Sequence, residues 1–358
     1  MYAKVCPLGE PSKCRTRSGS TDFILEVRYK CFILFCFDNL PLILQQLWFC
    51  ENCYNSIVGR VSVIICAYNE IKFVEQCLSN LQKIRDTELN DLKVIVKDNA
   101  STDGTAEVVE QKFPWVKLIR GENKGLSYGY NIGYKASDTE FLLFLGMDAF
   151  PEAGTIPGLI EYFDKNEEVG ASTCKLVLND GSLDMDAHRG FPTPWISLTR
   201  LLGLHKIFPN SETFNGYFLP GRNMNEPHEI DLCISHFMFT RRKVLDQIDG
   251  FDEDFFLYGE DVDVCYRIKK AGWKLMYLPQ FTAKHMKGGS VGIRKTTRDM
   301  VKKPLQHRLK MQRLTSEAMA LFVKKHYMDK YPKLFVYLML ISSRLLGYLR
   351  VFVESLRR

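Results

Sequence analysis

The chain has 358 residues, of which 46% are hydrophobic and 25% are charged. This is the composition of an ordinary folded protein, long enough for one large domain or two modest ones, and it excludes low-complexity and short-repeat architectures. The net charge of +6 is unevenly distributed. The 75 residues from Lys284 onwards contain 18 Lys and Arg and 4 Asp and Glu, a net of +14, so the other 283 carry a net of −8. This basic segment indicates either an anionic partner or a solvated helical surface.

The first 57 residues differ from the rest of the chain. They contain six of the eleven cysteines, and Cys31–Cys50 is largely apolar but is interrupted by an aspartate, an asparagine and a proline. A membrane span needs about 20 mostly apolar residues, and a signal peptide lies closer to the N-terminus. We therefore predict an N-terminal extension over 1–57 and a folded domain that begins near Val58. An interfacial anchor, a helical appendage and a segment outside the working protein remain open for this extension.

From Val61 onwards, apolar runs of strand length alternate with amphipathic runs of helix length. The predicted strands are 61–67, 92–96, 116–119 and 141–145, and the predicted helices are 70–85, 103–112 and 125–137. Continuous apolar strands favour a parallel sheet covered on both faces, and the alternation favours an α/β sandwich. The predicted fold class is therefore α/β, with a mostly parallel central sheet flanked by helices.

Polar residues follow these strands at the point where each one ends. In an open α/β sheet this carboxyl edge is where ligands bind. The chain has no G-x-G-x-x-G and no G-x-x-x-x-G-K-[ST] sequence, which argues against a dinucleotide site or a P-loop. Asp98 lies at the exit of the second strand, where its carboxylate can accept a hydrogen bond from the N–H of a nucleotide base. The first half therefore reads as a nucleotide-binding unit.

Four segments in this half resemble the family 2 glycosyltransferases of the GT-A fold: VSVIICAYNE, VIVKDNASTDGT, ENKGLSYGYNIGYKAS and FLLFLGMDAF. The resemblance implies a GT-A type sandwich and a UDP-, dTDP- or GDP-linked sugar donor. It also implies that Tyr68 and Asp98 face the nucleoside base. Gly125 and Asn131 would then line the diphosphate or the donor sugar. The predicted donor-binding residues are Tyr68, Glu70, Asp98, Asn99, Gly125, Asn131 and Asp148.

Asp148 leaves a buried strand, and a carboxylate there is a suitable hard ligand for a Mg²⁺ or Mn²⁺ ion that bridges the donor phosphates. The family pattern at this point is D-x-D or N-P-D, whereas this chain reads Gly146-Met147-Asp148 and keeps only the final carboxylate. A histidine after a later strand can complete the metal site in the family, and His285 matches that position. The predicted cofactor is Mg²⁺ or Mn²⁺, held by Asp148 and His285.

The run FDEDFFLYGEDVDVCYR, over 251–267, resembles the acceptor-side motif of the same family. Its carboxylates open a predicted helix, where the macrodipole favours acidic residues and Asp263 can pair with Arg267. An inverting transfer needs a base that deprotonates the acceptor hydroxyl. The resemblance assigns this role to Asp261, with Glu260 as the second catalytic residue.

The segment HRGFPTPW, over 188–195, resembles a loop of the rhamnosyltransferase-like members, which are bacterial or archaeal enzymes of surface polysaccharide. Relatives read approximately D-W-V-S-G-A before a pair of arginines, whereas this chain reads DLCISH, from Asp231 to His236. Replacement of a small Gly-Ala pair by Ser235-His236 reshapes the pocket wall near the sugar, so the identity of the donor sugar stays open. The predicted acceptor-binding residues are Asp231, Tyr258 and Asp263.

The C-terminal segment 334–353 is long enough to span a bilayer, but it contains Arg344 and Arg350. An arginine near the centre of a span costs about 2.5–3.5 kcal/mol. An interfacial helix fits the same composition, and a helix packed on the domain is the third interpretation. The predicted division is a GT-A domain over 58–290, with a nucleotide-binding half to 150 and an acceptor-binding half after it, and a basic, membrane-associated helical tail over 291–358.

These features predict an inverting hexosyl- or deoxyhexosyl-transferase that acts on a glycan or lipid-linked acceptor in cell-surface polysaccharide or glycoconjugate synthesis. The alternative is a non-catalytic or degenerate homologue that only binds a nucleotide sugar. A nucleotidyltransferase would have a glycine-rich basic loop where this chain has AYNE. We expect no nucleic-acid partner, because the basic tail has no recognised binding motif for it. Single cysteines in apolar runs indicate a cytoplasmic protein, here peripheral at the inner face of the cell membrane.

Overall fold

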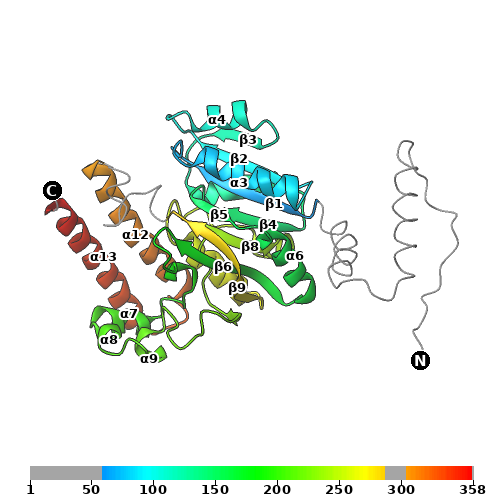
Figure 1. The fold of residues 1–358 in the computed structure, drawn as a ribbon. Coiled ribbons are helices and arrows are strands. Elements are labelled where there is room, and N and C mark those ends of the chain that lie inside the picture. Colours follow the sequence, from blue (N-terminus) through cyan, green and yellow to red (C-terminus); the bar gives the residue numbers. More distant parts are fainter. Residues whose placement is uncertain (1–58, 287–303, 357–358) are drawn as a thin grey trace, which may run out of the picture. The chain divides into compact units, whose positions relative to one another are not determined.

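The structure is a computed structural model that describes residues 59–286 and 304–356 (Figure 1). Within these residues the centre is a 9-stranded sheet in the order β3-β2-β1-β4-β8-β6-β9-β5, with β7 paired to β9. The predicted extension over 1–57 lies outside the described residues, as does the predicted boundary at 290 between the domain and its tail.

The first half of the chain forms a parallel α/β unit. Its strands are β1 (Val61–Ala67), β2 (Lys93–Asn99), β3 (Lys117–Gly121) and β4 (Phe141–Leu145), and its helices are α3 (Val74–Thr87), α4 (Thr105–Lys112) and α5 (Leu126–Lys135). The four strands pair in parallel, in the order β3-β2-β1-β4. The strands and helices predicted from hydrophobic periodicity are therefore confirmed, with shifts of a few residues at their ends.

The second half completes the sheet with both strand directions. The strands are β5 (Ala149–Pro151), β6 (Val169–Leu178), β7 (His228–Glu229), β8 (Phe237–Arg241) and β9 (Lys274–His285), and the helices are α6 (Thr155–Lys165), α10 (Arg242–Ile248) and α11 (Glu260–Lys270). Strand β8 is antiparallel to both β4 and β6, and β6 is parallel to β9. Strand β8 therefore begins at the same edge of the sheet where β1, β2, β4 and β9 end.

Further helices lie outside this sheet. Between β6 and β7 the chain forms η1 (Met185–Ala187), α7 (Pro194–Leu201), α8 (Leu204–Ile207) and α9 (Glu212–Asn215), and after the undescribed gap it forms α12 (Leu305–His326) and α13 (Lys333–Leu356). Figure 1 shows α12 and α13 running side by side, and they contact each other along their lengths. Helix α13 also contacts α7.

Apolar side chains cover both faces of the sheet. In β1, Val63 and Ile65 belong to one hydrophobic cluster and Ile64 belongs to the other. All three side chains are fully buried. A strand whose successive residues are all buried is expected where helices cover both faces. The core therefore holds the strand ends in place, and the polar residues that follow them form one edge.

Candidate active site

The exits of β1 and β2 are tied together by side chains at the predicted base-binding edge. Asn69 has a left-handed backbone (φ 57°). Its backbone N–H donates to Ser101 Oγ, and its side-chain Oδ1 accepts from the Thr102 backbone N–H. Asp98 is buried, and its Oδ2 accepts from the Ser101 N–H at 3.1 Å. Its Oδ1 has no hydrogen-bond partner among the described residues. A buried carboxylate oxygen without a partner is available to a donor such as a base N–H.

The other predicted base-side residues differ in exposure. Tyr68 is 49% exposed and can present its ring to a ligand, whereas Glu70 and Asn99 are buried. The Asn99 amide donates to the Gly125 carbonyl, and its Oδ1 accepts from Lys97 Nζ at 2.9 Å. Asn99 therefore joins β2 to the start of α5. The donor contacts predicted for these residues stay predictions.

The loop before α5 lies directly against the predicted acceptor motif. Gly125 has φ 105°, and a Cβ there would lie 2.5 Å from the Phe256 carbonyl oxygen, so only glycine fits. The Leu126 N–H donates to that same carbonyl at 2.7 Å. The Asn131 amide donates to the Phe251 carbonyl and to Glu253, and its Oδ1 accepts from the Phe251 N–H. Both residues thus join the nucleotide-binding half to the acceptor motif, and their donor contacts remain predictions.

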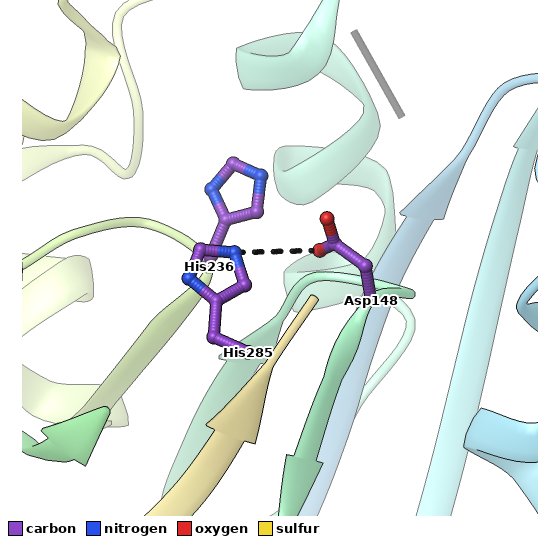
Figure 2. A group of neighbouring side chains, drawn as sticks. All are labelled: Asp148, His236 and His285. Atoms are coloured by element: carbon purple, nitrogen blue, oxygen red, sulfur yellow. Dashed lines mark ion pairs between the residues drawn. The ribbon is translucent and has the colours of Figure 1, made fainter. Parts of the chain in front are cut away.

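Asp148, His236 and His285 form a compact group that could hold a metal ion (Figure 2). Their candidate ligand atoms all lie within 4.8 Å of one another. Asp148 follows β4, His285 ends β9 and His236 immediately precedes β8, so the sheet topology brings all three to one edge. His285 Nε2 lies 3.6 Å from Asp148 Oδ1, and His285 Nδ1 lies 2.8 Å from Asp184 Oδ2. The structure thus brings together the two predicted metal ligands and adds a third.

The chemistry of this group fits a divalent cation. Asp148 Oδ1 and His236 Nδ1 are buried without a hydrogen-bond partner among the described residues. Asp184 orients the imidazole of His285, an arrangement common around metal-bound histidines. Burial lowers the pKa of His285, but the Asp148 and Asp184 carboxylates outweigh this and raise it to about 9. A bound cation would replace that proton.

The carboxylate pair Glu260 and Asp261 opens α11, and both residues are buried. Glu260 Oε1 accepts from Ser235 Oγ at 2.9 Å, and Glu260 Oε2 has no partner among the described residues. Burial and the adjacent negative charge of Asp261 raise the pKa of Glu260 to about 7. Asp261 Oδ1 accepts from the Val262 N–H, and its Oδ2 accepts from Arg189 at 2.5 Å. Burial lowers the pKa of Arg189, but Asp261 outweighs this and raises it above its usual value.

The predicted acceptor-binding residues have protein partners of their own. Asp263 has a buried side chain whose Oδ2 pairs with Arg267, as predicted, and whose Oδ1 lies 2.6 Å from His326 of α12. Asp231 pairs with Lys269 at 2.7 Å. Tyr258 has a left-handed backbone (φ 66°) and directly precedes Gly259, the N-cap of α11. The structure shows Asp263 joining two helices, and contact of these residues with an acceptor stays a prediction.

Sequence reasoning missed three residues of this site: Arg189, Asp184 and His236. In the sequence Arg189 stands out only as part of a loop, and its partner Asp261 lies 72 residues away. Asp184 carries no motif of its own. His236 was recognised only as a bulky replacement in a pocket wall. The sequence does contain a signal for His236: a histidine stands where relatives have a small residue, in a chain that has Gly146 where the family pattern has a carboxylate.

Comparison with known proteins identifies relatives of the chain. Residues 62–249, more than half of its length, match the family described as Glycosyl transferase family 2. The chain is 25% identical over 233 residues to the Rhamnosyltransferase WbbL of Escherichia coli (strain K12), covering 63% of this chain and 83% of that protein. It is 29% identical over 245 residues to the N-acetylglucosaminyl-diphospho-decaprenol L-rhamnosyltransferase of Mycobacterium tuberculosis (strain CDC 1551 / Oshkosh), covering 64% and 77%.

The fold also has a solved counterpart. The structure of the Mannosyltransferase PcManGT from Pyrobaculum calidifontis, in complex with GDP-Man and Mn²⁺, matches with a TM-score of 0.50. The match covers 87% of this chain and 80% of that chain at 17% sequence identity, which supports the predicted GT-A fold alone. Together with the match over 62–249, the order of elements shows that this chain belongs to glycosyltransferase family 2 and is a glycosyltransferase that uses a nucleotide-sugar donor.

Proposed function

We propose that the chain catalyses the inverting transfer of a hexosyl or deoxyhexosyl group from a nucleotide sugar to a hydroxyl of a lipid-linked or glycan acceptor. One observation carries this proposal: Ser235 donates a hydrogen bond to Glu260, while the next residue, His236, lies in the group with Asp148. In an inverting displacement the leaving diphosphate and the acceptor base lie on opposite faces of the same anomeric carbon, so the groups that hold them must line one site. Ser235 and His236 therefore join the candidate catalytic carboxylates to the candidate metal site.

The proposed roles follow from burial and hydrogen bonding. Asp98 would accept from the nucleoside base through its unpartnered Oδ1. Asp148 and His285 would hold a Mg²⁺ or Mn²⁺ ion, which would supply positive charge beside the donor diphosphate. Asp261 would act as the base toward the acceptor hydroxyl, with Arg189 fixing its orientation. Glu260 is the second candidate for the base, because a pKa of about 7 suits proton transfer near neutral pH.

The acceptor class is supported by a relative. The protein from Mycobacterium tuberculosis carries a name that specifies an N-acetylglucosaminyl-diphospho-decaprenol acceptor. In this chain, a cavity of about 860 Å³ lies beside the acceptor motif. It is lined by Phe255, Phe256 and Leu257 on one side and by residues of α12 and α13, including Tyr348 and Val351, on the other. The apolar side chains of this cavity, which charged residues such as Arg313, Glu317 and Lys324 also line, suit the lipid portion of such an acceptor.

Helix α13 supports attachment to an anionic membrane surface. Among the described helices it is the one long and apolar enough to cross a membrane, and little of it is buried. Its exposed apolar residues are Leu334, Phe335, Tyr337, Leu338, Ile341, Leu345, Tyr348, Leu349, Phe352, Val353 and Leu356. Most recur at spacings of three, four or seven and so share one face. Because Arg344 and Arg350 are exposed on the same helix, we propose that it lies in the interface.

The transfer proposal is tested by a donor panel. The purified protein is incubated with UDP-, dTDP- and GDP-linked sugars and either Mg²⁺ or Mn²⁺, and release of the nucleoside diphosphate is measured. We expect release with one base and one sugar class, and an increase when a lipid-linked acceptor is added. A well-folded protein that releases no nucleoside diphosphate from any donor would favour the non-catalytic alternative.

The membrane proposal is tested by flotation with liposomes. The wild-type chain should float with anionic vesicles and less so with neutral ones, and higher salt should weaken binding. Leu338→Glu with Leu345→Glu should abolish flotation, because both changes place charge on the apolar face. Asn90→Asp with Gln111→Glu adds the same charge at exposed positions in the first half and should leave flotation unchanged. Equal flotation of both variants would contradict the proposal.

A further inference from the structure

The metal-facing edge contains one residue that neither the D-x-D pattern nor the predicted ligand pair accounts for. We propose that His236 is the third protein ligand of the metal ion and takes the place of the carboxylate that a D-x-D sequence would have at Gly146. The ligand set would then be one carboxylate and two imidazoles. This inference rests on the metal-assisted transfer proposed above and specifies the ligands and the metal preference of that site.

The first argument is the register of the two segments. Strands β4 and β8 pair antiparallel up to Leu145 and Phe237, and the Gly146 N–H donates to the His236 carbonyl at 2.9 Å. Position 146 therefore lies beside position 236 at the end of the ladder. Position 146 is two residues before Asp148, and position 236 directly follows Ser235. Both positions therefore lie next to residues of the site.

The second argument is space. A Cβ built on Gly146 would lie 2.6 Å from His236 Cδ2 and 3.0 Å from Asp148 Oδ1. Real Cβ atoms do not approach other atoms that closely, so a side chain at 146 and the present ring position at 236 exclude each other. The imidazole of His236 occupies the space beside Asp148 that a side chain at 146 would need. A side chain at 146 would therefore require the imidazole of His236 to move.

The third argument is the hydrogen bonding of the group. Asp148 Oδ1 and His236 Nδ1 are both buried without a hydrogen-bond partner among the described residues, and Asp148 Oδ1 is ion-paired with His285 Nε2 at 3.6 Å, beyond hydrogen-bond distance. Burial of such polar atoms costs free energy unless a ligand satisfies them. Figure 2 shows both imidazole rings beside the Asp148 carboxylate, and the two ring centres are 5.5 Å apart. A cation between the three side chains would be bound by each of them.

The ligand types then set a metal preference. Mg²⁺ prefers oxygen ligands and near-ideal octahedral geometry. Imidazole nitrogen binds first-row transition ions, with affinity rising from Mn²⁺ to Co²⁺ in the usual order. A site with two imidazoles and one carboxylate should therefore bind Co²⁺ more tightly than Mn²⁺, and both more tightly than Mg²⁺. A site with two carboxylates and one imidazole would discriminate less.

The test measures metal binding to the full chain without any donor. Mn²⁺ binding is followed by electron paramagnetic resonance of the free ion, and pulsed measurements on bound Mn²⁺ count the coupled imidazole nitrogens. The wild type should show two imidazole couplings. His236→Ala and His236→Gln should show one coupling and bind Mn²⁺ at least about tenfold more weakly. His205→Ala removes a histidine from helix α8, outside the group, and should change neither quantity.

An exchange variant tests the coupling between the two positions. Gly146→Asp with His236→Ala restores a carboxylate and removes the ring, so it should bind Mn²⁺ with one imidazole coupling and let Mg²⁺ compete better than in the wild type. Gly146→Asp alone should displace His236 and lose one coupling. Melting curves by circular dichroism establish that each variant is folded.

The inference is overturned if the wild type shows fewer than two imidazole couplings, or if loss of His236 leaves both coupling count and affinity unchanged. Absence of bound Mn²⁺ at millimolar concentrations would overturn it too. Because no donor is present, these results are independent of catalysis. A protein that binds Mn²⁺ through two imidazoles but releases no nucleoside diphosphate would contradict the proposed function and uphold this inference.

Discussion

At the scale of single residues, the site separates two neighbouring carboxylates by their partners. Asp261 has both oxygens engaged, by Arg189 and by the Val262 N–H. Glu260 has one oxygen bound to Ser235 and one without a partner among the described residues. Neighbouring acids in different environments often divide the work of a site, because each environment sets its own protonation state.

Asp261→Asn tests the assignment of the base. The amide keeps the size of the side chain but cannot accept the acceptor proton, so we expect transfer to fall by about 10²–10⁴-fold while donor binding survives. Asp138→Asn is the control, since this carboxylate is 76% exposed and pairs with Lys93 outside the site, and it should retain activity. If Asp261→Asn stays active and Glu260→Gln does not, the base is Glu260.

Glu260→Gln also tests the electrostatic cost of the buried carboxylate. The folded-state pKa is raised from 4.5 to about 7, so on passing from pH 4.5 to 7 the unfolded chain loses its proton first and the folded protein loses stability. Glutamine cannot ionise and should remove this loss. The variant should gain up to about 3 kcal/mol relative to the wild type above pH 7 and little below pH 4.5. Denaturant unfolding across this pH range measures the gain in unfolding free energy. A gain that does not depend on pH would contradict ionisation of Glu260 as its cause.

At the scale of elements, the regular parallel half of the fold could be predicted from the sequence, whereas the short helices between β6 and β7 could not. The continuous apolar runs of β1 and β4 identify buried strands, because their periodicity is local. The short helices α8 and α9 have four residues each and no buried side chain, so no apolar pattern marks them. His236 and Arg189 reach the site only through long-range pairing, which local patterns do not contain. Asp148 and His285 could be predicted because each lies at the exit of an apolar strand and matches a position of the family resemblance.

The junction between α5 and the acceptor motif provides a prediction at this scale. Asn131 makes three hydrogen bonds across it, and all are buried or partly buried. Asn131→Ala leaves the Phe251 N–H and carbonyl without these partners, so unfolding free energy should fall by about 1–3 kcal/mol. Asn90→Ala, at an exposed position, should be neutral. A large rise in donor KM with unchanged stability would instead support the donor-binding role predicted from sequence.

At the scale of the whole molecule, the charge and the apolar surface are concentrated at the C-terminal end. Helix α13 packs closely on α12, since a Cβ on Gly347 would lie 2.6 Å from Ser316 Oγ, and Arg308 pairs with Glu354 at 2.9 Å. This contact holds α13 against the domain and leaves its other face exposed. One helix pair thus lines the cavity beside the acceptor motif and also presents the proposed membrane surface. A lipid-linked acceptor could reach the site from that surface.

Residues 1–57 and the C-terminal helix should differ in what they contribute to folding, donor hydrolysis and membrane binding. The buried residues of both hydrophobic clusters in the described part of the chain lie between Val61 and Val336, and the family match begins at residue 62. Removal of residues 1–57 should therefore leave the melting temperature, donor hydrolysis and flotation unchanged. Truncation before Ile341, which keeps the buried Val336, should retain donor hydrolysis but weaken flotation, because it removes most of the exposed apolar face while the sheet edge stays complete. If the first truncation unfolds the protein, the extension is part of the working domain, and the predicted boundary near Val58 is wrong.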